Sequence, residues 1–264
     1  MTARILIIAG SDSGGGAGIQ ADIKTVTMLG GYAMTAITAV TAQNTVGVQG
    51  VLPMPPEVIS AQIDSVIGDI GVDAIKIGML PNAEAVKIVA SMLLMFRPQL
   101  RRTGTQKGLF PIPMVVDPVM IATSGDRLVD DAAVKTMFSH LFPLATVITP
   151  NLDEFEWLGG EEAVTKITAP ILVKGGHGGG NTIIDRLIDR DGEIARWEDR
   201  RIVSTSTHGT GCTLSSAIAC GLGQGLSLTI AIERARRFVR AAIVAAPGFG
   251  KGHGPMGHHA VRDL

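Results

Sequence analysis

Short apolar, β-branched runs alternate with stretches of helical periodicity along this chain, and this alternation limits the fold more than any other feature. The runs at 5–9, 74–77 and 114–116 have the length and composition of strands buried on both faces. Between the first two, apolar side chains recur at the helical spacing of 4, 7, 8 and 11 residues after Ile59. Strands that alternate with helices predict an α/β fold with a mostly parallel sheet.

The same reading extends to the rest of the chain. We expect further strands at 36–42, 47–52, 145–148 and 170–173, with 47–52 at a sheet edge, and an antiparallel pair at 182–187 and 193–197. The expected helices cover 19–29, 59–70, 86–94, 130–141, 210–222 and 228–246. Prolines, glycines and basic residues make 97–111 an expected exposed loop. No repeat or linker interrupts the pattern, so we expect one domain over 1–264.

Composition excludes several classes of function. Lys and Arg number 23 against 24 Asp and Glu, so no basic excess suits a nucleic-acid backbone, and aromatics at 4% are too few for base stacking. No apolar run reaches the ~18 residues that a membrane helix needs, and 5–9 is too short for a signal peptide. Two cysteines, Cys212 and Cys220, form no disulfide framework. We therefore expect a cytoplasmic protein with a small-molecule partner, and neither nucleic acid nor a membrane.

Polar residues and glycines follow the expected strands where each one ends. Gly10, Gln43, Met79, Asp117 and Lys174 all stand at or just after the end of a strand. Loops are commonly polar for structural reasons alone, but six successive strand ends behave alike. Because ligands of open α/β sheets bind outside the carboxyl ends of the strands, we predict a site at this edge.

The glycine cluster at 14–18 matches neither of the two common phosphate motifs. It lacks the third glycine of the dinucleotide fingerprint, and the chain contains no P-loop. A nicotinamide-dependent oxidoreductase is therefore the least favoured reading. The cluster is either a turn or a place where backbone approaches a ligand closely.

The segment 207–212, Thr-His-Gly-Thr-Gly-Cys, precedes an apolar helix and carries the strongest local signal. Free N–H groups at a helix start, together with the helix dipole, favour an anion such as a transferring phosphoryl group. The same environment is expected to lower the pKa of Cys212 and to favour its thiolate. The alternative is an ordinary helix start that contains glycine.

Three oxygen-bearing residues are candidates for Mg²⁺ and its water shell: Asp117, Asn151 and Glu154. Turn and helix-capping chemistry explains the same residues equally well. Lys174 ends a buried strand, so its charge must reach water or an anion, and a nucleotide phosphate would suit it.

Other candidates have less support. The histidines His253, His258 and His259 suit a mobile glycine-rich tail better than a metal site. Met79 and Met120 stand at strand ends and are expected to form pocket walls.

Taken together, seven segments resemble the hydroxymethylpyrimidine/phosphomethylpyrimidine kinases of thiamine biosynthesis, in the ribokinase-like superfamily. The matching segments run in order from about residue 5 to 255, and they are 10–12 with 15–22, 41–45, 76–80, 117–120, 149–154, 174–177 and 208–213. This resemblance implies a three-layer α/β/α fold and ATP-dependent phosphorylation of 4-amino-5-hydroxymethyl-2-methylpyrimidine and then of its monophosphate. It also implies ATP and Mg²⁺ as cofactors and, commonly, a homodimer.

The resemblance also implies roles for individual residues. Those at the pyrimidine are Gln43, Asp22, Gly10 and Met79; those at the nucleotide are Lys174, Thr207 and Asn151; those at the metal are Asp117 and Glu154; and those of the anion hole are Gly209, Thr210, Gly211 and Cys212. Cys212 stands where most of the superfamily places an aspartate base, so it is expected to take the hydroxyl proton.

The chain departs from the family pattern in three places. Gly14 replaces a usual serine, Thr123 replaces a common lysine, and the segment 155–173 is short, so that a peripheral helix is expected to be largely lost. Two alternatives stay open: a pyridoxine or pyridoxal kinase of the same superfamily, and a non-catalytic pyrimidine-binding protein. Gln43 and Cys212 favour the pyrimidine over pyridoxine, and the intact phosphate-side residues favour an enzyme.

Overall fold

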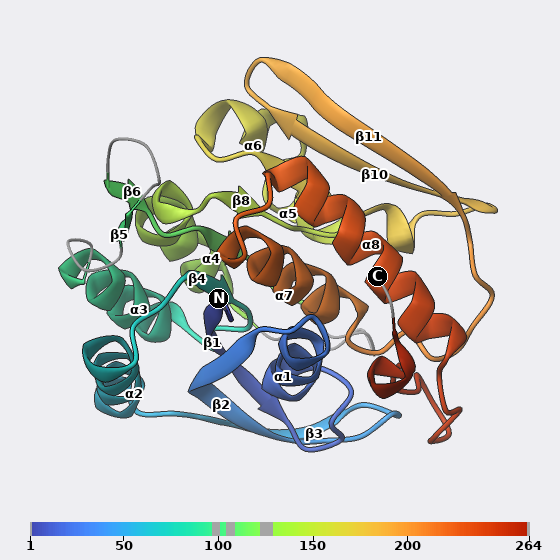
Figure 1. Cartoon of the computed structure of the whole chain (residues 1–264), viewed down its shortest axis with the longest axis horizontal. Helices are drawn as coiled ribbons and strands as arrows, with labels where there is room; N and C mark the ends of the chain where they lie inside the picture. Colours follow the sequence, from blue (N-terminus) through green and yellow to red (C-terminus); the bar gives the residue numbers. More distant parts are fainter. Residues whose placement is uncertain (1, 97–100, 104–108, 122–128, 263–264) are drawn as a thin grey trace.

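A computed structural model describes residues 2–96, 101–103, 109–121 and 129–262, so Thr123 lies outside the described residues. Within them a nine-stranded sheet has the order β11-β10-β9-β8-β7-β4-β1-β2-β3 (Figure 1). Its strands are β1 (Arg4–Asp12), β2 (Tyr32–Gln43), β3 (Val48–Pro53), β4 (Ala74–Ile77), β7 (Met114–Val116), β8 (Val147–Ile148), β9 (Ile171–Val173), β10 (Thr182–Asp189) and β11 (Gly192–Arg200).

The centre of the sheet is parallel and its margins are antiparallel. Every neighbouring pair from β9 to β2 is parallel. β3 pairs antiparallel with β2 at one edge, and β10 and β11 form an antiparallel hairpin at the other. The prediction of a mostly parallel sheet is confirmed, as are the edge position of 47–52 and the antiparallel pair after residue 181.

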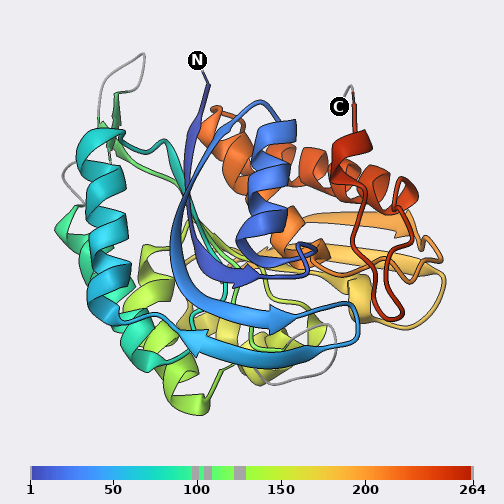
Figure 2. The same cartoon turned by 90° about the horizontal axis from the view of Figure 1, so that it is seen from below.

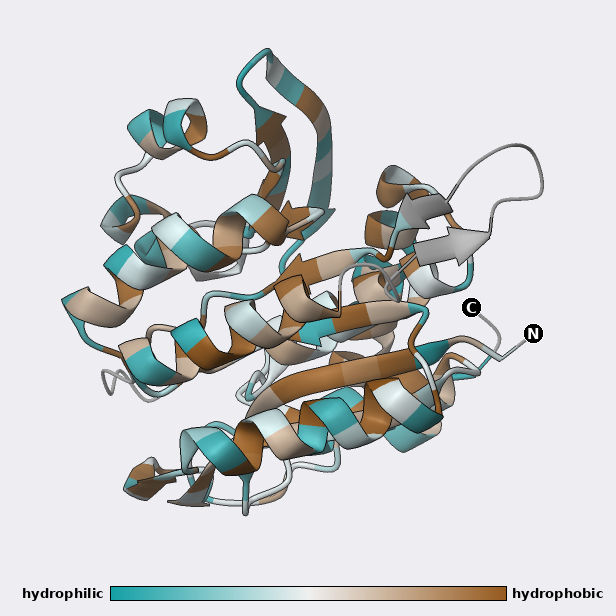
Figure 3. Cartoon of the chain, turned by 90° about the vertical axis from the view of Figure 1, so that its left-hand side faces the viewer, coloured by the Kyte–Doolittle hydropathy of each residue, from teal (hydrophilic) through white to brown (hydrophobic). Residues whose placement is uncertain are grey.

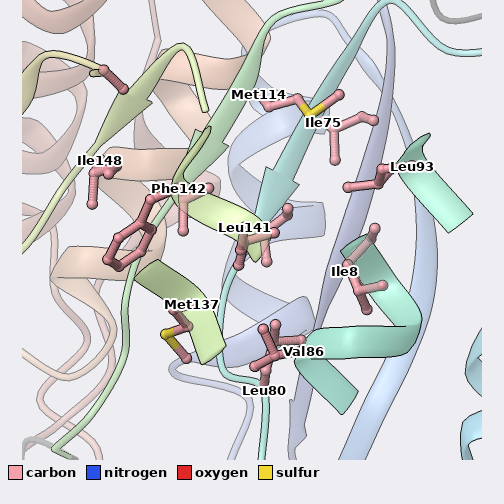
Figure 4. Close-up of a cluster of buried hydrophobic side chains, with 14 of the residues drawn as sticks. Ile8, Ile75, Leu80, Val86, Leu93, Met114, Met137, Leu141, Phe142 and Ile148 are labelled. Atoms are coloured by element: carbon pink, nitrogen blue, oxygen red, sulfur yellow. The ribbon is translucent and has the colours of Figure 1, made fainter. Parts of the chain in front are cut away.

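The central strands are mainly apolar, as their mostly brown colour in Figure 3 shows, because helices cover both faces of the sheet. Successive side chains alternate between faces. Leu6 and Ile8 of β1 enter one core with Ile75 and Ile77 of β4 (Figure 4). Their neighbours Ile5 and Ile7 enter a second core on the opposite face. A continuous apolar run therefore builds two cores at once.

Helices cover both faces, which gives the three-layer α/β/α arrangement that the resemblance implied (Figure 2). One layer contains α2 (Pro56–Asp69), α3 (Ala83–Met95) and α4 (Asp131–Thr136), and the other contains α1 (Gly18–Met28), α7 (Thr210–Gly223) and α8 (Leu228–Val244). α7 packs against β1, β4 and β7 at the middle of the sheet. No helix in the described part of the chain has the length and apolar character needed to cross a membrane.

Several expected elements differ in the structure. The expected loop at 97–111 contains, in its described residues, two short antiparallel strands, β5 (Arg101–Thr103) and β6 (Leu109–Pro111). Main-chain hydrogen bonds hold such a pair, so composition does not reveal it. The expected helix at 130–141 is α4 followed by a π-helical turn, Met137–Leu141, and a 3-10 turn, Phe142–Leu144. β1 also runs on through residues 10–12, which were expected to form a loop.

The short segment 155–173 retains helical structure. α5 (Leu152–Trp157) and α6 (Glu161–Lys166) are each six residues long. Phe155 and Val164 from these helices pack into the core that α2 and α3 cover. The shortening therefore leaves two small helices on this side of the sheet.

The C-terminal segment is packed against the molecule, so the prediction of a mobile tail is wrong for His258. That side chain is 2% exposed, and its Nε2 lies 2.8 Å from the hydroxyl of Thr213 on α7. Met256 and Val261 pack with Phe238 of α8 in a small third core. Apolar neighbours thus hold a segment whose glycines suggested mobility.

Candidate functional site

One cavity of about 440 Å³ lies at the carboxyl ends of the parallel strands. Every predicted site residue except Asp22 lines it, namely Gly10, Gln43, Met79, Asp117, Asn151, Glu154, Lys174, Thr207, Gly209, Thr210, Gly211 and Cys212. These residues come from seven segments that span two hundred positions of sequence. The structure therefore brings the predicted residues together as a single site, although it leaves their roles open.

Side chains along the cavity follow the order of the strands. Gln43 is on β2, Gly10 on β1, Asp117 follows β7, and Lys174 follows β9. The start of α7 lies over this row, because a Cβ on Gly211 would lie 3.2 Å from Nζ of Lys174 and 3.6 Å from Oδ2 of Asp117, and α7 packs against β1, β4 and β7. The cavity thus has a β1–β2 end and a β9–β11 end, with the α7 N-terminus between them.

The β1–β2 end carries an amide with defined hydrogen-bond partners. Oε1 of Gln43 lies 3.1 Å from the hydroxyl of Thr41, and Nε2 of Gln43 lies 3.4 Å from Nε2 of His208. Gly10 lies directly against Met79, because a Cβ there would lie 2.6 Å from the Met79 Cε. An amide that both donates and accepts, beside an apolar wall, suits a small polar heterocycle.

His208 and Asp12 form a pair that the sequence analysis missed. Nε2 of His208 lies 2.9 Å from Oδ2 of Asp12. The same carboxylate accepts the backbone N–H groups of Gly14, Gly16 and Ala17. Burial raises the pKa of Asp12. Hydrogen bonds from His208 and from the N–H groups of Ala17 and Gly14 lower it by more, so the net shift of the pKa is downward. The pair fixes the glycine cluster against the turn that precedes α7.

That turn depends on Gly209. Its φ of 80° lies in the left-handed region, and a Cβ would collide with the carbonyl oxygen of Gly16. The first N–H groups of a helix have no acceptor within it, and Gly211 and Cys212 of α7 line the cavity. The N–H of Thr210 donates to the carbonyl oxygen of Thr207 at 3.3 Å. A helix start on a cavity wall suits an anion, and the predicted anion hole stays a prediction.

The prediction of a Cys212 thiolate is wrong. Burial raises the pKa of this thiol to about 11, and the lowering by Lys76 is opposed by Asp22 and Asp117. The helix start is therefore outweighed by desolvation and by two carboxylates. At neutral pH the group is a thiol.

Asp22 does not line the cavity, which corrects its expected contact with the pyrimidine. It is fully buried, and its two carboxylate oxygens accept from Lys76 Nζ at 2.9 Å and from the Ser216 hydroxyl at 2.6 Å. Sequence position cannot show this, because Lys76 on β4 and Ser216 on α7 come together only in the folded chain. Met120 is likewise buried in the core, and Val119 and Ile121 line the cavity in its place.

Lys174 finds its anion inside the protein. Nζ lies 2.7 Å from Oδ1 of Asp117, which also accepts from the Thr149 hydroxyl at 3.0 Å. Burial raises the pKa of Asp117, but Lys174 and Lys76 more than reverse this and lower it. Asp117 thus holds the ammonium group of Lys174 in place beside the α7 N-terminus.

Asn151 and Glu154 cap the N-terminus of α5, which is the structural role that the sequence offered as the alternative to metal binding. Asn151 Oδ1 accepts the N–H of Glu154 at 2.8 Å, and Glu154 Oε2 accepts the N–H of Asn151 at 2.9 Å. Burial raises the pKa of Glu154 to about 7, with Lys174 opposing and Asp117 adding to the rise. The carboxylates of Asp117 and Glu154 on the cavity wall fit a cation. Because their oxygens already accept hydrogen bonds, they suit Mg²⁺ that is bound mainly through water molecules. The described residues contain no group of three or more His, Cys, Asp or Glu that could hold a metal ion.

The β9–β11 end has a mixed lining that sequence reasoning did not predict. Four aliphatic side chains, Ile183, Ile202, Val239 and Ile243, line it together with the charged residues Asp185, Asp199, Arg236 and Arg240. Arg201 shapes the glycine turn beside them, since its guanidinium donates to the carbonyl oxygens of Gly176 and Gly180 at 2.6 and 2.9 Å. The aliphatic side chains suit the face of a flat ring, and the charged ones suit polar groups around it.

A missed residue with a recognisable signal is Lys76. It is the one charged residue in the four-residue strand β4, and it lines the cavity while fully buried. Like Lys174, Lys76 belongs to a buried strand, so its charge also must reach water or an anion.

Comparison with known proteins gives a consistent family assignment. The model of the phosphomethylpyrimidine kinase family matches residues 12–257. A hydroxymethylpyrimidine/phosphomethylpyrimidine kinase of Rhizobium meliloti is 45% identical over 98% of this chain and 97% of its own length. The thiamine biosynthesis bifunctional protein ThiED of Geobacter sulfurreducens is 44% identical over 96% of this chain, which spans about half (52%) of that protein.

A solved structure is also similar. The ADP complex of Bacillus subtilis pyridoxal kinase superposes with a TM-score of 0.83 at 32% identity, over 98% of both chains. This chain therefore shares the fold of that pyridoxal kinase.

Proposed function

Because the chain belongs to the phosphomethylpyrimidine kinase family, we propose that it phosphorylates 4-amino-5-hydroxymethyl-2-methylpyrimidine and then its monophosphate, using ATP, in thiamine biosynthesis. The observation that carries this proposal is the single cavity in which Gln43, the α7 N-terminus and Lys174 lie in that order along the sheet edge. An acceptor, a transferring phosphoryl group and a nucleotide require the same order.

Each part of the cavity has an assigned task. Gln43 hydrogen-bonds the aminopyrimidine, with Met79 and Gly10 shaping the wall. The apolar lining by Ile202 and Val239 receives the adenine ring. Thr207, Asn151 and Lys174 hold the nucleotide phosphates. Phosphoryl transfer needs mainly positioning and charge stabilisation, and this arrangement supplies both.

The α7 N-terminus acts on the group in transfer. The backbone N–H groups of Gly209, Thr210 and Gly211 stabilise the charge of the transferring phosphoryl. The thiolate form of Cys212 takes the proton of the hydroxymethyl group in the first transfer and becomes the thiol. In the second transfer the acceptor is already a phosphate, so no base is required.

Asp117 and Glu154 are the residues that would hold Mg²⁺, through water and phosphate oxygens. The ion would neutralise negative charge on the nucleotide phosphates. This chain's own contribution is to keep Asp117 ionised, which the contact with Lys174 favours.

The test is an assay with ATP, Mg²⁺ and the hydroxymethyl pyrimidine in which mono- and diphosphate products are resolved. We expect both products in sequence, with the monophosphate consumed as the diphosphate forms. Calorimetric binding of the pyrimidine without any ATP turnover would instead support a non-catalytic binding protein.

A second candidate is pyridoxal kinase activity, which the similarity to the Bacillus subtilis enzyme favours. Comparing kcat/KM for the two acceptors decides, because specificity is that ratio. We expect the pyrimidine to be preferred. Sedimentation would test the homodimer that we also propose from the resemblance.

A further inference from the structure

Lys76 is a fully buried lysine on the cavity wall that the proposed mechanism does not use. It pairs in register with Ile7 of β1 and Val115 of β7, and these two neighbours belong to the core beneath α7. Its side chain therefore rises on the face of the sheet that α7 covers, at the centre of the row of strand ends.

The ammonium group of Lys76 is held by Asp22, which does not line the cavity. Asp22 accepts from it at 2.9 Å, and Ser216 of α7 holds the second oxygen of Asp22. An ammonium carries three donors, and among the described residues Asp22 is its one hydrogen-bond acceptor. Burying donors without acceptors is costly, so the remaining ones require an acceptor from the cavity.

Two lysines therefore flank the start of α7. Lys174 follows β9 and faces Gly211, whereas Lys76 is on β4, which pairs with β1, the strand that carries Gly10, and is two strands away from β2, which carries Gln43. Burial lowers the pKa of Lys76, but the neighbouring carboxylates of Asp22 and Asp117 raise it, and the net shift is upward. Lys76 thus provides a permanent positive charge on the acceptor side.

The two acceptors of the proposed reaction differ in charge. The hydroxymethyl pyrimidine is a neutral alcohol, whereas its monophosphate carries about −1.5 to −2 near neutral pH. We propose that Lys76, positioned by Asp22 and Ser216, binds the phosphate group of the monophosphate when it serves as the second acceptor. This inference rests on the proposed function and adds a residue that distinguishes its two steps.

The test compares wild type with Lys76→Met/Asp22→Asn, which removes both charges and leaves no unpaired buried ion. Calorimetry without ATP measures the affinity for each acceptor, and initial rates measure each transfer. A charge-assisted hydrogen bond corresponds to about 10- to 100-fold in affinity. We expect a loss of that size for the monophosphate and a change within about threefold for the alcohol.

Gly78→Ala is a second variant that keeps every charge. A Cβ there would lie 2.7 Å from Nζ of Lys76 and 3.0 Å from the Cβ of Ala9, so the methyl group displaces the flexible lysine side chain more than its rigid neighbour. We expect the same selective loss of monophosphate affinity. ADP affinity serves as the folding control for both variants and should be unchanged.

Equal losses for both acceptors, or an unchanged affinity for the monophosphate, would overturn the role of Lys76. A wild-type protein that phosphorylates neither acceptor would refute the proposed function instead. If wild type performs both transfers, but the variants lose as much affinity for the alcohol as for the monophosphate, only the inference about Lys76 fails.

Discussion

At the scale of single residues, Cys212 shows that local sequence does not fix acidity. A helix start favours a thiolate, yet burial raises the pKa of this thiol to about 11. A base with that pKa is ionised in about one molecule in 10⁴ at pH 7. The base role of Cys212 therefore has a distinctive pH dependence.

We predict that the first transfer accelerates about tenfold per pH unit between pH 7 and 10, because the thiolate fraction rises at that rate below the pKa. Cys212→Ala should abolish this slope and cost about 10²–10³ in kcat at pH 8. The second transfer, with its phosphate acceptor, should lose less. Rates by product-resolved chromatography would measure all three effects.

Cys220→Ala is the matched control, since Cys220 is buried in α7 and is absent from the cavity lining. It should leave both transfers unchanged. A Cys212→Ala rate within about twofold of wild type would exclude the base role.

At the scale of elements, the N-terminus of α7 is held from two directions. The Asp12–His208 pair holds the preceding turn, and His258 of the C-terminal segment contacts Thr213 in the first turn of the helix. The first contact joins residues about two hundred positions apart in the sequence, and the second joins residues about fifty positions apart. The position of the anion-binding turn is therefore a tertiary property.

The second contact predicts an acid-sensitive stability. Burial lowers the pKa of His258 to about 4, against 6.5 ordinarily. The unfolded chain therefore gains a proton first as pH falls, and stability is lost between about pH 6.5 and 4, by on the order of 3 kcal/mol. Urea unfolding at pH 7 and pH 4.5 would show a steeper loss for wild type than for His258→Gln.

His259→Gln is the control, because His259 is the exposed neighbour on the same turn. Its unfolding should follow wild type at both values of pH. If His258→Gln retained the full wild-type pH dependence, burial of His258 would not be its cause.

At the scale of the whole molecule, the cavity joins six strand ends to α7 and α8. A ligand that occupies it contacts segments from both ends of the chain, so binding is coupled to global unfolding. The prediction that residues 1–264 form one domain stays a prediction.

We predict that the pyrimidine and ADP each stabilise the folded chain by about 2.7 kcal/mol at a hundred times their Kd. For a chain of this size this raises Tm by roughly 5–10 °C. Scanning calorimetry with each ligand would measure it. Gln43→Leu should lose the shift with the pyrimidine and keep the shift with ADP; loss of both would show that Gln43 acts on folding rather than on the acceptor.

By itself, the sequence determined most of the order of strands and helices, the mostly parallel sheet and the edge at which the cavity lies. It did so because strand and helix periodicity are local, and because parallel strands place their carboxyl ends together. The motifs also identified twelve of the residues that line the cavity.

Only the tertiary structure decided what those residues can do. It buried Asp22 behind Lys76, paired Asp12 with His208, raised the pKa of Cys212 and packed His258 against α7. Desolvation and Coulomb interactions depend on which distant segments become neighbours and on how much water they exclude. Those quantities do not exist until the chain has folded.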